Sequence, residues 1–354
     1  MFRTHAALAA VSLWLFSTLA GASDDPMHVL SNGIVLTMDK SDQVAQAVAI
    51  SGERIVGVGS NVEIETLAGP DAHVIDVGGR TIIPGLVDTH VHAIRGGQTF
   101  RFETYWYDAT TLTGALENLK ATAAERGAGK WVTVAGAWSP DQFEEKRGPT
   151  VEDLNTALPN NPAYVQCLYD YALLNEKGLE ALGLIKEGAS IPGIEIERDA
   201  EGKPTGKLFG DVGSFSFLFN KIGTLEDDER KESLAAYFNV LNSRGVTGLV
   251  DAAGGGSGSA VYDPLFSLWR DNRLTLRVSY RVSAQVPGNE ATWFANTVAY
   301  LPAHFGDSML QFLGLGEILV FKMNDGVRLR PGFSGSEDGK EELYRVAMLA
   351  AHRK

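Results

Sequence analysis

The sequence has a single cysteine, Cys167, among its 354 residues. One cysteine cannot close an intramolecular disulfide or supply a cysteine-based zinc module. Basic residues are also scarce, because 31 lysines and arginines face 44 aspartates and glutamates, which leaves a net charge of −13. An acidic surface argues against nucleic acids and anionic membranes as partners. The charge does not identify a substrate, and the ordinary share of hydrophobic residues, 44%, indicates a globular protein.

Long hydrophobic runs are absent beyond the N-terminus. The one such run, residues 6–20, follows the basic start MFRTH and precedes Ala20-Gly21-Ala22, a small-x-small cleavage site. This layout is typical of a secretory signal peptide, and the run is short for a spanning helix. We predict a signal peptide over residues 1–22 and an exported protein, periplasmic or secreted, that leaves the membrane after cleavage. An N-terminal membrane anchor is the alternative.

The pattern of strands changes along the mature chain. Residues 23–83 hold short strand-like runs separated by turn signals such as Asn32-Gly33, which favours a small β-sandwich or part of one. From residue 84 to residue 354, strand-like and helical segments alternate, and alternation predicts βα units with a parallel sheet. A barrel and an open sheet both satisfy this pattern. A β-hairpin insertion around residues 184–230 interrupts it.

The clearest chemical motif is Asp88-Thr89-His90-Val91-His92. Side chains alternate along a strand, so His90 and His92 point to the same face and can bind one metal ion. The pair ends an apolar run, and parallel α/β folds carry their active sites at the carboxyl ends of the strands. Two unrelated histidines at a strand end are the alternative.

A second motif is Lys322, which follows the apolar run Ile318-Leu319-Val320-Phe321. Burial of a lysine favours the neutral amine, which can react with carbon dioxide to form a carbamate. The two carbamate oxygens could bridge two metal ions. The alternative is a lysine that extends from a strand end into solvent.

The run PGLVDTHVH resembles the first metal-ligand motif of the amidohydrolase superfamily. The runs WVTVAGAWSPDQF, PTVEDLNTALPNNPAYVQ, LLNEKGLEALG, GKPTGKL and GVTGLVDAAG resemble its amidohydrolase 3 (YtcJ-like) branch, which includes N-substituted formamide deformylases. The resemblance covers nearly all of residues 27–354. It implies a TIM-like barrel, about half present, joined to a small N-terminal β-sandwich domain. It also implies a lysine ligand after the fourth barrel strand, where Lys322 falls.

The resemblance implies a set of site residues and a reaction. His90, His92 and Lys322 would hold one or two divalent ions, most often zinc, with Lys322 carbamylated and catalytic. Trp138, Asp141 and Tyr171 would line the substrate pocket, with loop packing as the alternative for Trp138 and Asp141. The expected reaction is hydrolysis of a non-peptide C–N bond, of the amide or formamide type, through a metal-activated water.

The resemblance implies that a complete enzyme needs further metal-site residues. These are two histidines on later barrel strands and an aspartate on the eighth barrel strand. Residues 340–354 are typical of the helix that leads into the fifth strand, so we expect a fragment, a truncated frame or an incomplete gene model. We therefore expect the chain alone to lack activity. The alternative function is a non-catalytic exported binding protein on a degenerate scaffold. The sequence leaves open whether the chain forms a homo-oligomer.

Overall fold

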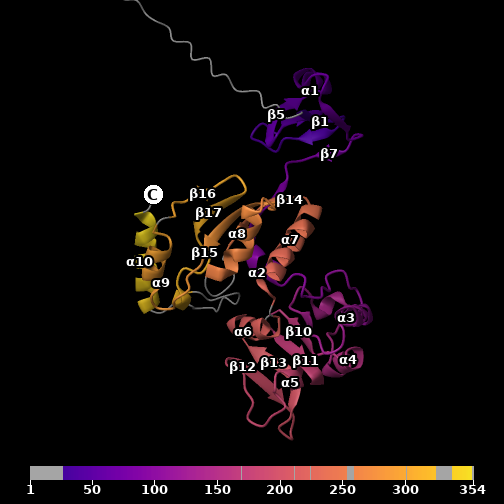
Figure 1. Ribbon diagram of the computed structural model, residues 1–354, viewed down its shortest axis with the longest axis vertical. Coiled ribbons are helices and arrows are strands. Elements are labelled where there is room, and N and C mark those ends of the chain that lie inside the picture. Colours follow the sequence, from indigo (N-terminus) through magenta and orange to yellow (C-terminus); the bar gives the residue numbers. More distant parts are fainter. Residues whose placement is uncertain are drawn as a thin grey trace, which may run out of the picture. The chain divides into compact units, whose positions relative to one another are not determined.

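The computed structural model describes residues 27–168, 170–210, 212–223, 225–252, 259–299, 301–323 and 337–352. The chain forms two compact units, one that ends at Gly85 and one that begins at Leu86 (Figure 1). The predicted signal peptide lies outside the described residues. None of the described helices is both long enough and apolar enough to cross a bilayer.

The first unit consists of two small sheets and one helix. The larger sheet has the strand order β5-β4-β1-β6, and the smaller has the order β3-β2-β7. Helix α1 (Asn61–Ala68) begins at a capping box in which Ser60 and Glu63 bond reciprocally, and it packs Ile64 against Val29 and Ala49. The strands are β1 (Met27–Ser31), β2 (Ile34–Leu36), β3 (Val44–Ala45), β4 (Ala47–Ser51), β5 (Arg54–Gly59), β6 (His73–Asp76) and β7 (Thr81–Ile82).

The second unit contains a parallel sheet, as the alternating pattern predicts. Its order is β16-β17-β15-β14-β8, in which β8, β14, β15 and β17 run parallel and β16 is an antiparallel edge strand. These strands are β8 (Leu86–Val91), β14 (Val246–Asp251), β15 (Arg277–Val282), β16 (Phe305–Gly306) and β17 (Leu310–Leu315). The helices of this region are α2 (Ala93–Gln98), α7 (Asp227–Ser243), α8 (Asp263–Arg270), α9 (Glu290–Thr297) and α10 (Glu337–Ala351), with 3₁₀ turns η2 (Ser259–Tyr262) and η3 (Phe321–Met323).

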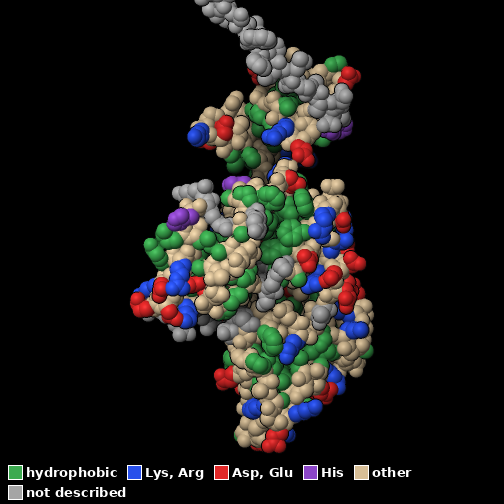
Figure 2. All heavy atoms as spheres, turned by 60° about the vertical axis from the view of Figure 1, so that its left-hand side comes forward, with side chains coloured by type: hydrophobic (Ala, Val, Ile, Leu, Met, Phe, Trp, Pro, Cys, Tyr) green, Lys and Arg blue, Asp and Glu red, His purple; other side chains and the backbone are tan. Residues whose placement is uncertain are grey.

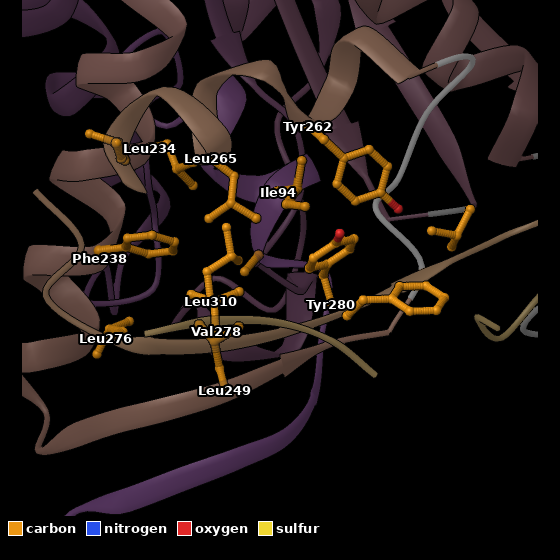
Figure 3. Packing of buried hydrophobic residues seen from close by; sticks show 14 of the residues in the cluster. Ile94, Leu234, Phe238, Leu249, Tyr262, Leu265, Leu276, Val278, Tyr280 and Leu310 are labelled. Atoms are coloured by element: carbon orange, nitrogen blue, oxygen red, sulfur yellow. The ribbon is translucent and has the colours of Figure 1, made fainter. Parts of the chain in front are cut away.

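The main core lies between this sheet and its helices. Figure 3 shows Ile94 of α2, Phe238 of α7 and Leu265 of α8 packed with strand residues such as Leu249 and Val278. All five are at most 2% exposed. On the surface, hydrophobic side chains are exposed among charged ones (Figure 2). At β8, which pairs only with β14 among the described strands, Leu86 and Val87 expose apolar side chains.

A second sheet interrupts the parallel one, and the interruption is larger than the hairpin expected at residues 184–230. Its order is β12-β13-β11-β10-β9, and only three residues separate β10 from β11. So short a connection allows only antiparallel pairing of β10 with β11, whereas β9 pairs in parallel with β10. Residues 130–138 and 163–168 therefore belong to this mixed sheet and not to the main parallel one. The elements are α3 (Leu112–Arg126), β9 (Val132–Val134), η1 (Pro140–Gln142), α4 (Val151–Ala157), β10 (Ala163–Cys167), β11 (Tyr171–Leu174), α5 (Glu176–Ala181), β12 (Ile194–Arg198), β13 (Pro204–Gly210) and α6 (Val212–Ile222).

Helix α2, which directly follows the histidine pair, is held close to α7 by a glycine. A Cβ atom placed on Gly97 would lie 2.3 Å from Leu234 Cδ1 and 3.2 Å from Leu234 Cα. The two helices can therefore approach at this point only without a side chain. The neighbouring Gly96 is not under this constraint, because its Cβ would lie 3.8 Å from Tyr237 Cζ, an ordinary contact.

We expect Gly97→Ala to destabilise the protein by about 1–3 kcal/mol, because the added methyl group overpacks the contact with Leu234. Gly96→Ala is the matched control on the same helix, and we expect it to be neutral or to stabilise by about 0.5 kcal/mol through lower chain entropy. Urea unfolding of both variants measures the difference. Equal unfolding free energies for the two variants would contradict the close approach.

Candidate metal centre

His90 and His92 occupy the carboxyl end of β8, as the sequence predicts. His90 lies within the strand, and His92 is the residue that precedes the first turn of α2. Their rings are 5.7 Å apart, centroid to centroid, and nearly perpendicular. Both Nε2 atoms approach the same carboxylate oxygen, so the two imidazoles reach one point in space.

The carboxylate between the imidazoles belongs to Glu317, which the sequence analysis did not single out. Strand β17 ends at Leu315, and the chain then passes so close to β14 that a Cβ on Gly316 would lie 2.9 Å from the carbonyl oxygen of Ala252. The amide of Glu317 donates to that same oxygen over 3.1 Å, and the amide of Ala252 donates to Val91 over 3.0 Å. These two bonds bring Glu317 beside the end of β8.

The three side chains have the spacing of a metal site. Glu317 Oε2 lies 3.0 Å from His90 Nε2 and 3.3 Å from His92 Nε2, and the three potential ligand atoms lie within 4.8 Å of one another. Neighbouring ligands of a tetrahedral zinc ion are separated by about 3.3 Å when the bonds are about 2.0 Å. Two imidazole nitrogens and one carboxylate oxygen are also a ligand set that zinc accepts. The residues therefore fit a divalent metal.

Two further carboxylates accept hydrogen bonds from the backbone at and just after the histidine pair. Asp88 Oδ1 accepts a hydrogen bond from the amide of His90 over 3.0 Å. Asp251, at the end of β14 and fully buried, accepts one from the amide of Ile94 over 2.8 Å. His92 makes no side-chain cap on α2, so Asp251 caps the first turn from the neighbouring strand and leaves the imidazole free to bind a metal.

Lys322 lies in a different setting from the one expected. It belongs to η3 rather than to a buried strand, its side chain is 51% exposed, and its ammonium forms an ion pair with Asp338 of α10. The expectation of a buried strand end is therefore wrong, because the strand stops at Leu315. The following Asn324-Asp325-Gly326 lies outside the described residues.

The predicted substrate residues lie in the region of the second sheet. Trp138 is buried with Trp106 and Phe143, and its Nε1 donates to the carbonyl oxygen of Gln166 over 2.8 Å, so loop packing accounts for it. Asp141 is exposed in the first turn of η1. Tyr171 is half-buried on β11 with Lys207 Nζ 4.7 Å from its ring centre, and burial raises the pKa of its phenol.

The single cysteine lies away from the three potential metal ligands, in the second sheet. Cys167 is buried at the end of β10. Burial is the main cause that raises the pKa of its thiol, and the nearby Asp170 carboxylate adds to the shift. A raised pKa reduces the thiolate fraction, and the thiolate is the reactive form.

The fold is that of metal-dependent hydrolases. A solved metal-dependent hydrolase from Pyrococcus horikoshii matches 92% of this chain and 63% of its own with a TM-score of 0.56 at 18% identity. Another, from Pyrococcus furiosus, matches 91% of this chain and 65% of its own with a TM-score of 0.55 at 20% identity. At these identities the likeness concerns the fold alone.

The sequence assigns the family. The sequence model described as "Amidohydrolase family" matches residues 73–354, so the chain belongs to the amidohydrolase family. An N-substituted formamide deformylase from Arthrobacter pascens is 33% identical over 233 residues, which is 63% of this chain and 42% of that enzyme. The putative amidohydrolase YtcJ of Bacillus subtilis is 26% identical over 221 residues, 61% of this chain and 40% of that protein. The amidohydrolase 3 branch predicted from the sequence is confirmed, and the chain spans about two fifths of these relatives.

Replacement of Glu317 by glutamine should lower the affinity for Zn²⁺ at least tenfold, which is about 1.4 kcal/mol, because the anionic ligand is lost. Lys322→Gln is the comparison, and we expect it to leave the affinity unchanged because the structure places this side chain against Asp338. Calorimetric titration of the metal-free chain measures both. The reverse pattern, loss with Lys322→Gln alone, would restore the lysine as the ligand.

Proposed function

We propose that this protein is a metal-dependent hydrolase that cleaves an amide-type C–N bond outside ordinary peptides. The observation that carries the proposal is the convergence of His90 and His92 on Glu317. Membership of the amidohydrolase family and the likeness to an N-substituted formamide deformylase support the bond type. Formamides and other N-substituted amides are the substrate class that we propose.

The proposed roles follow from the positions of the residues. His90 and His92 would hold the metal through Nε2, and Glu317 would hold it through its carboxylate. A divalent metal bound there, which we propose to be zinc, would polarise the amide carbonyl and lower the pKa of a water molecule. Asp88 and Asp251 would keep the backbone of the two histidines in place. Asp141 and Tyr171 remain candidates for substrate contacts.

We further propose that the parallel strands belong to a TIM-like barrel. Strands β8, β14, β15 and β17 follow one another in chain order and pair side by side, as barrel strands do. The apolar side chains of Leu86 and Val87 are exposed on β8, where a neighbouring barrel strand would cover them. The metal centre would then lie on the catalytic face, at the carboxyl ends of the strands.

The activity test compares this chain alone with the chain co-expressed with the rest of a related enzyme. We expect zinc-dependent hydrolysis of an N-substituted formamide when the chain is co-expressed with the unaligned part of the Arthrobacter pascens enzyme, and no turnover from either part alone. His90→Ala in this chain should abolish the hydrolysis. Zinc bound through the histidines without hydrolysis in any arm would instead favour a non-catalytic binding protein. A chain that binds no zinc would overturn the proposed metal centre.

We also propose that the protein is exported, on the signal-peptide layout of residues 1–22. Expression of the full sequence in a Gram-negative host should yield a periplasmic form that begins at Ser23. N-terminal sequencing of the periplasmic fraction reads this directly. A product that keeps residues 1–22 and sediments with membranes would support the anchor instead.

A further inference from the structure

A cavity separate from the metal centre lies between α2, α7 and the segment that follows α2. Its volume is about 440 Å³, within the range of small-molecule sites. Neither the histidines nor Glu317 line it. The loops that follow β9 and β10 also line it, through residues 135–137 and Leu168.

The wall of this cavity is aromatic. Phe100 lies 4.9 Å from Tyr105 and 5.4 Å from Tyr237, centroid to centroid, and Tyr105 stacks on Tyr107 at 5.2 Å. The Tyr105 hydroxyl donates to the carbonyl oxygen of Phe100 over 3.1 Å, which fixes the orientation of that ring. Such a wall offers ring faces and edges to a planar apolar ligand, and pairs of this kind each contribute about 0.5–1.5 kcal/mol beyond burial.

The charges at the cavity are mainly positive. Arg95 of α2 and Arg244, just after α7, both line it, and both are exposed. Within the described residues, neither guanidinium makes a hydrogen bond or an ion pair. The one carboxylate of the lining is Glu103, which accepts a hydrogen bond from the Thr99 hydroxyl over 2.5 Å. Burial raises the pKa of Glu103, and the Thr99 hydrogen bond and the charge of Arg95 act in the opposite direction.

We propose that this cavity binds a small aromatic carboxylate, with its ring against the tyrosine and phenylalanine wall and its carboxylate on Arg95 or Arg244. A guanidinium presents paired N–H donors that match the two oxygens of a carboxylate. The protein as a whole repels anions through its net charge of −13, so recognition depends on these two local cations. The site is independent of the proposed hydrolysis, because it shares none of the three metal-centre residues.

The test uses three probes of nearly equal shape on the full chain, namely phenylacetate, phenylacetamide and phenethylammonium. We expect calorimetry to show one molecule of phenylacetate bound per chain, with the neutral amide at least tenfold weaker. Arg95→Gln or Arg244→Gln, whichever holds the carboxylate, should weaken phenylacetate at least fivefold. Arg270→Gln, on α8 outside the cavity, is the matched control and should leave the affinity unchanged.

Two further variants distinguish binding in this cavity from binding at the metal centre. Tyr107→Leu, at a side chain that is 53% exposed and therefore tolerant of change, should weaken phenylacetate by loss of the stacked ring. The double variant His90→Ala/His92→Ala should bind phenylacetate normally. Loss of binding in that double variant would assign the probe to the metal centre and overturn the proposal. Four other results would also overturn the proposal. They are tighter binding of phenethylammonium than of phenylacetate, equal affinity for all three probes, no phenylacetate binding, and an affinity for phenylacetate that neither arginine variant changes.

Discussion

The candidate metal centre depends on two backbone hydrogen bonds that cross the carboxyl ends of the parallel strands. The amide of Ala252 donates to the carbonyl oxygen of Val91, and the amide of Glu317 donates to that of Ala252. The chain segments that follow β8, β14 and β17 are therefore held side by side. Side chains alone could not provide this precision, because all three potential ligands are exposed and have rotational freedom. The backbone hydrogen bonds restrict the positions of the Cα atoms that carry these side chains. Less conformational entropy is therefore lost when the side chains bind a metal.

The same arrangement explains why glycine and buried carboxylates surround the site. Gly316 permits the close approach to Ala252, and Gly97 permits the close approach of α2 to α7. Asp251 caps α2 in place of His92, whose side chain is needed elsewhere. Burial and the nearby carboxylates of Asp88 and Asp251 raise the pKa of Tyr237, which keeps this neighbour a neutral phenol.

The sequence predicted those features that depend on local pattern. Alternation along one strand is enough to place His90 and His92 on one face, and the succession of apolar runs and helices predicts a parallel sheet. The sequence did not reveal Glu317, because a carboxylate becomes a candidate ligand only when its spatial neighbours are known. The signal that could have found it is the pair of glycines at 314 and 316, which ends the strand before the apolar run at 318–321. Lys322 was favoured because that run was interpreted as the strand and because the family resemblance implies a lysine ligand after it.

The second sheet shows a related limit of pattern alone. The runs at β9 and β10 have the buried, apolar character of parallel strands, and β10 is buried along its whole length. The short connection between Cys167 and Tyr171 forces β10 into a hairpin with β11, and β9 belongs to the same sheet because it pairs in parallel with β10. Because this sheet is inserted between β8 and β14, it supplies the loops at residues 135–137 and Leu168 that line the aromatic cavity together with α2 and α7. The insertion thus creates a binding cavity that the parallel strands and their helices would not form by themselves.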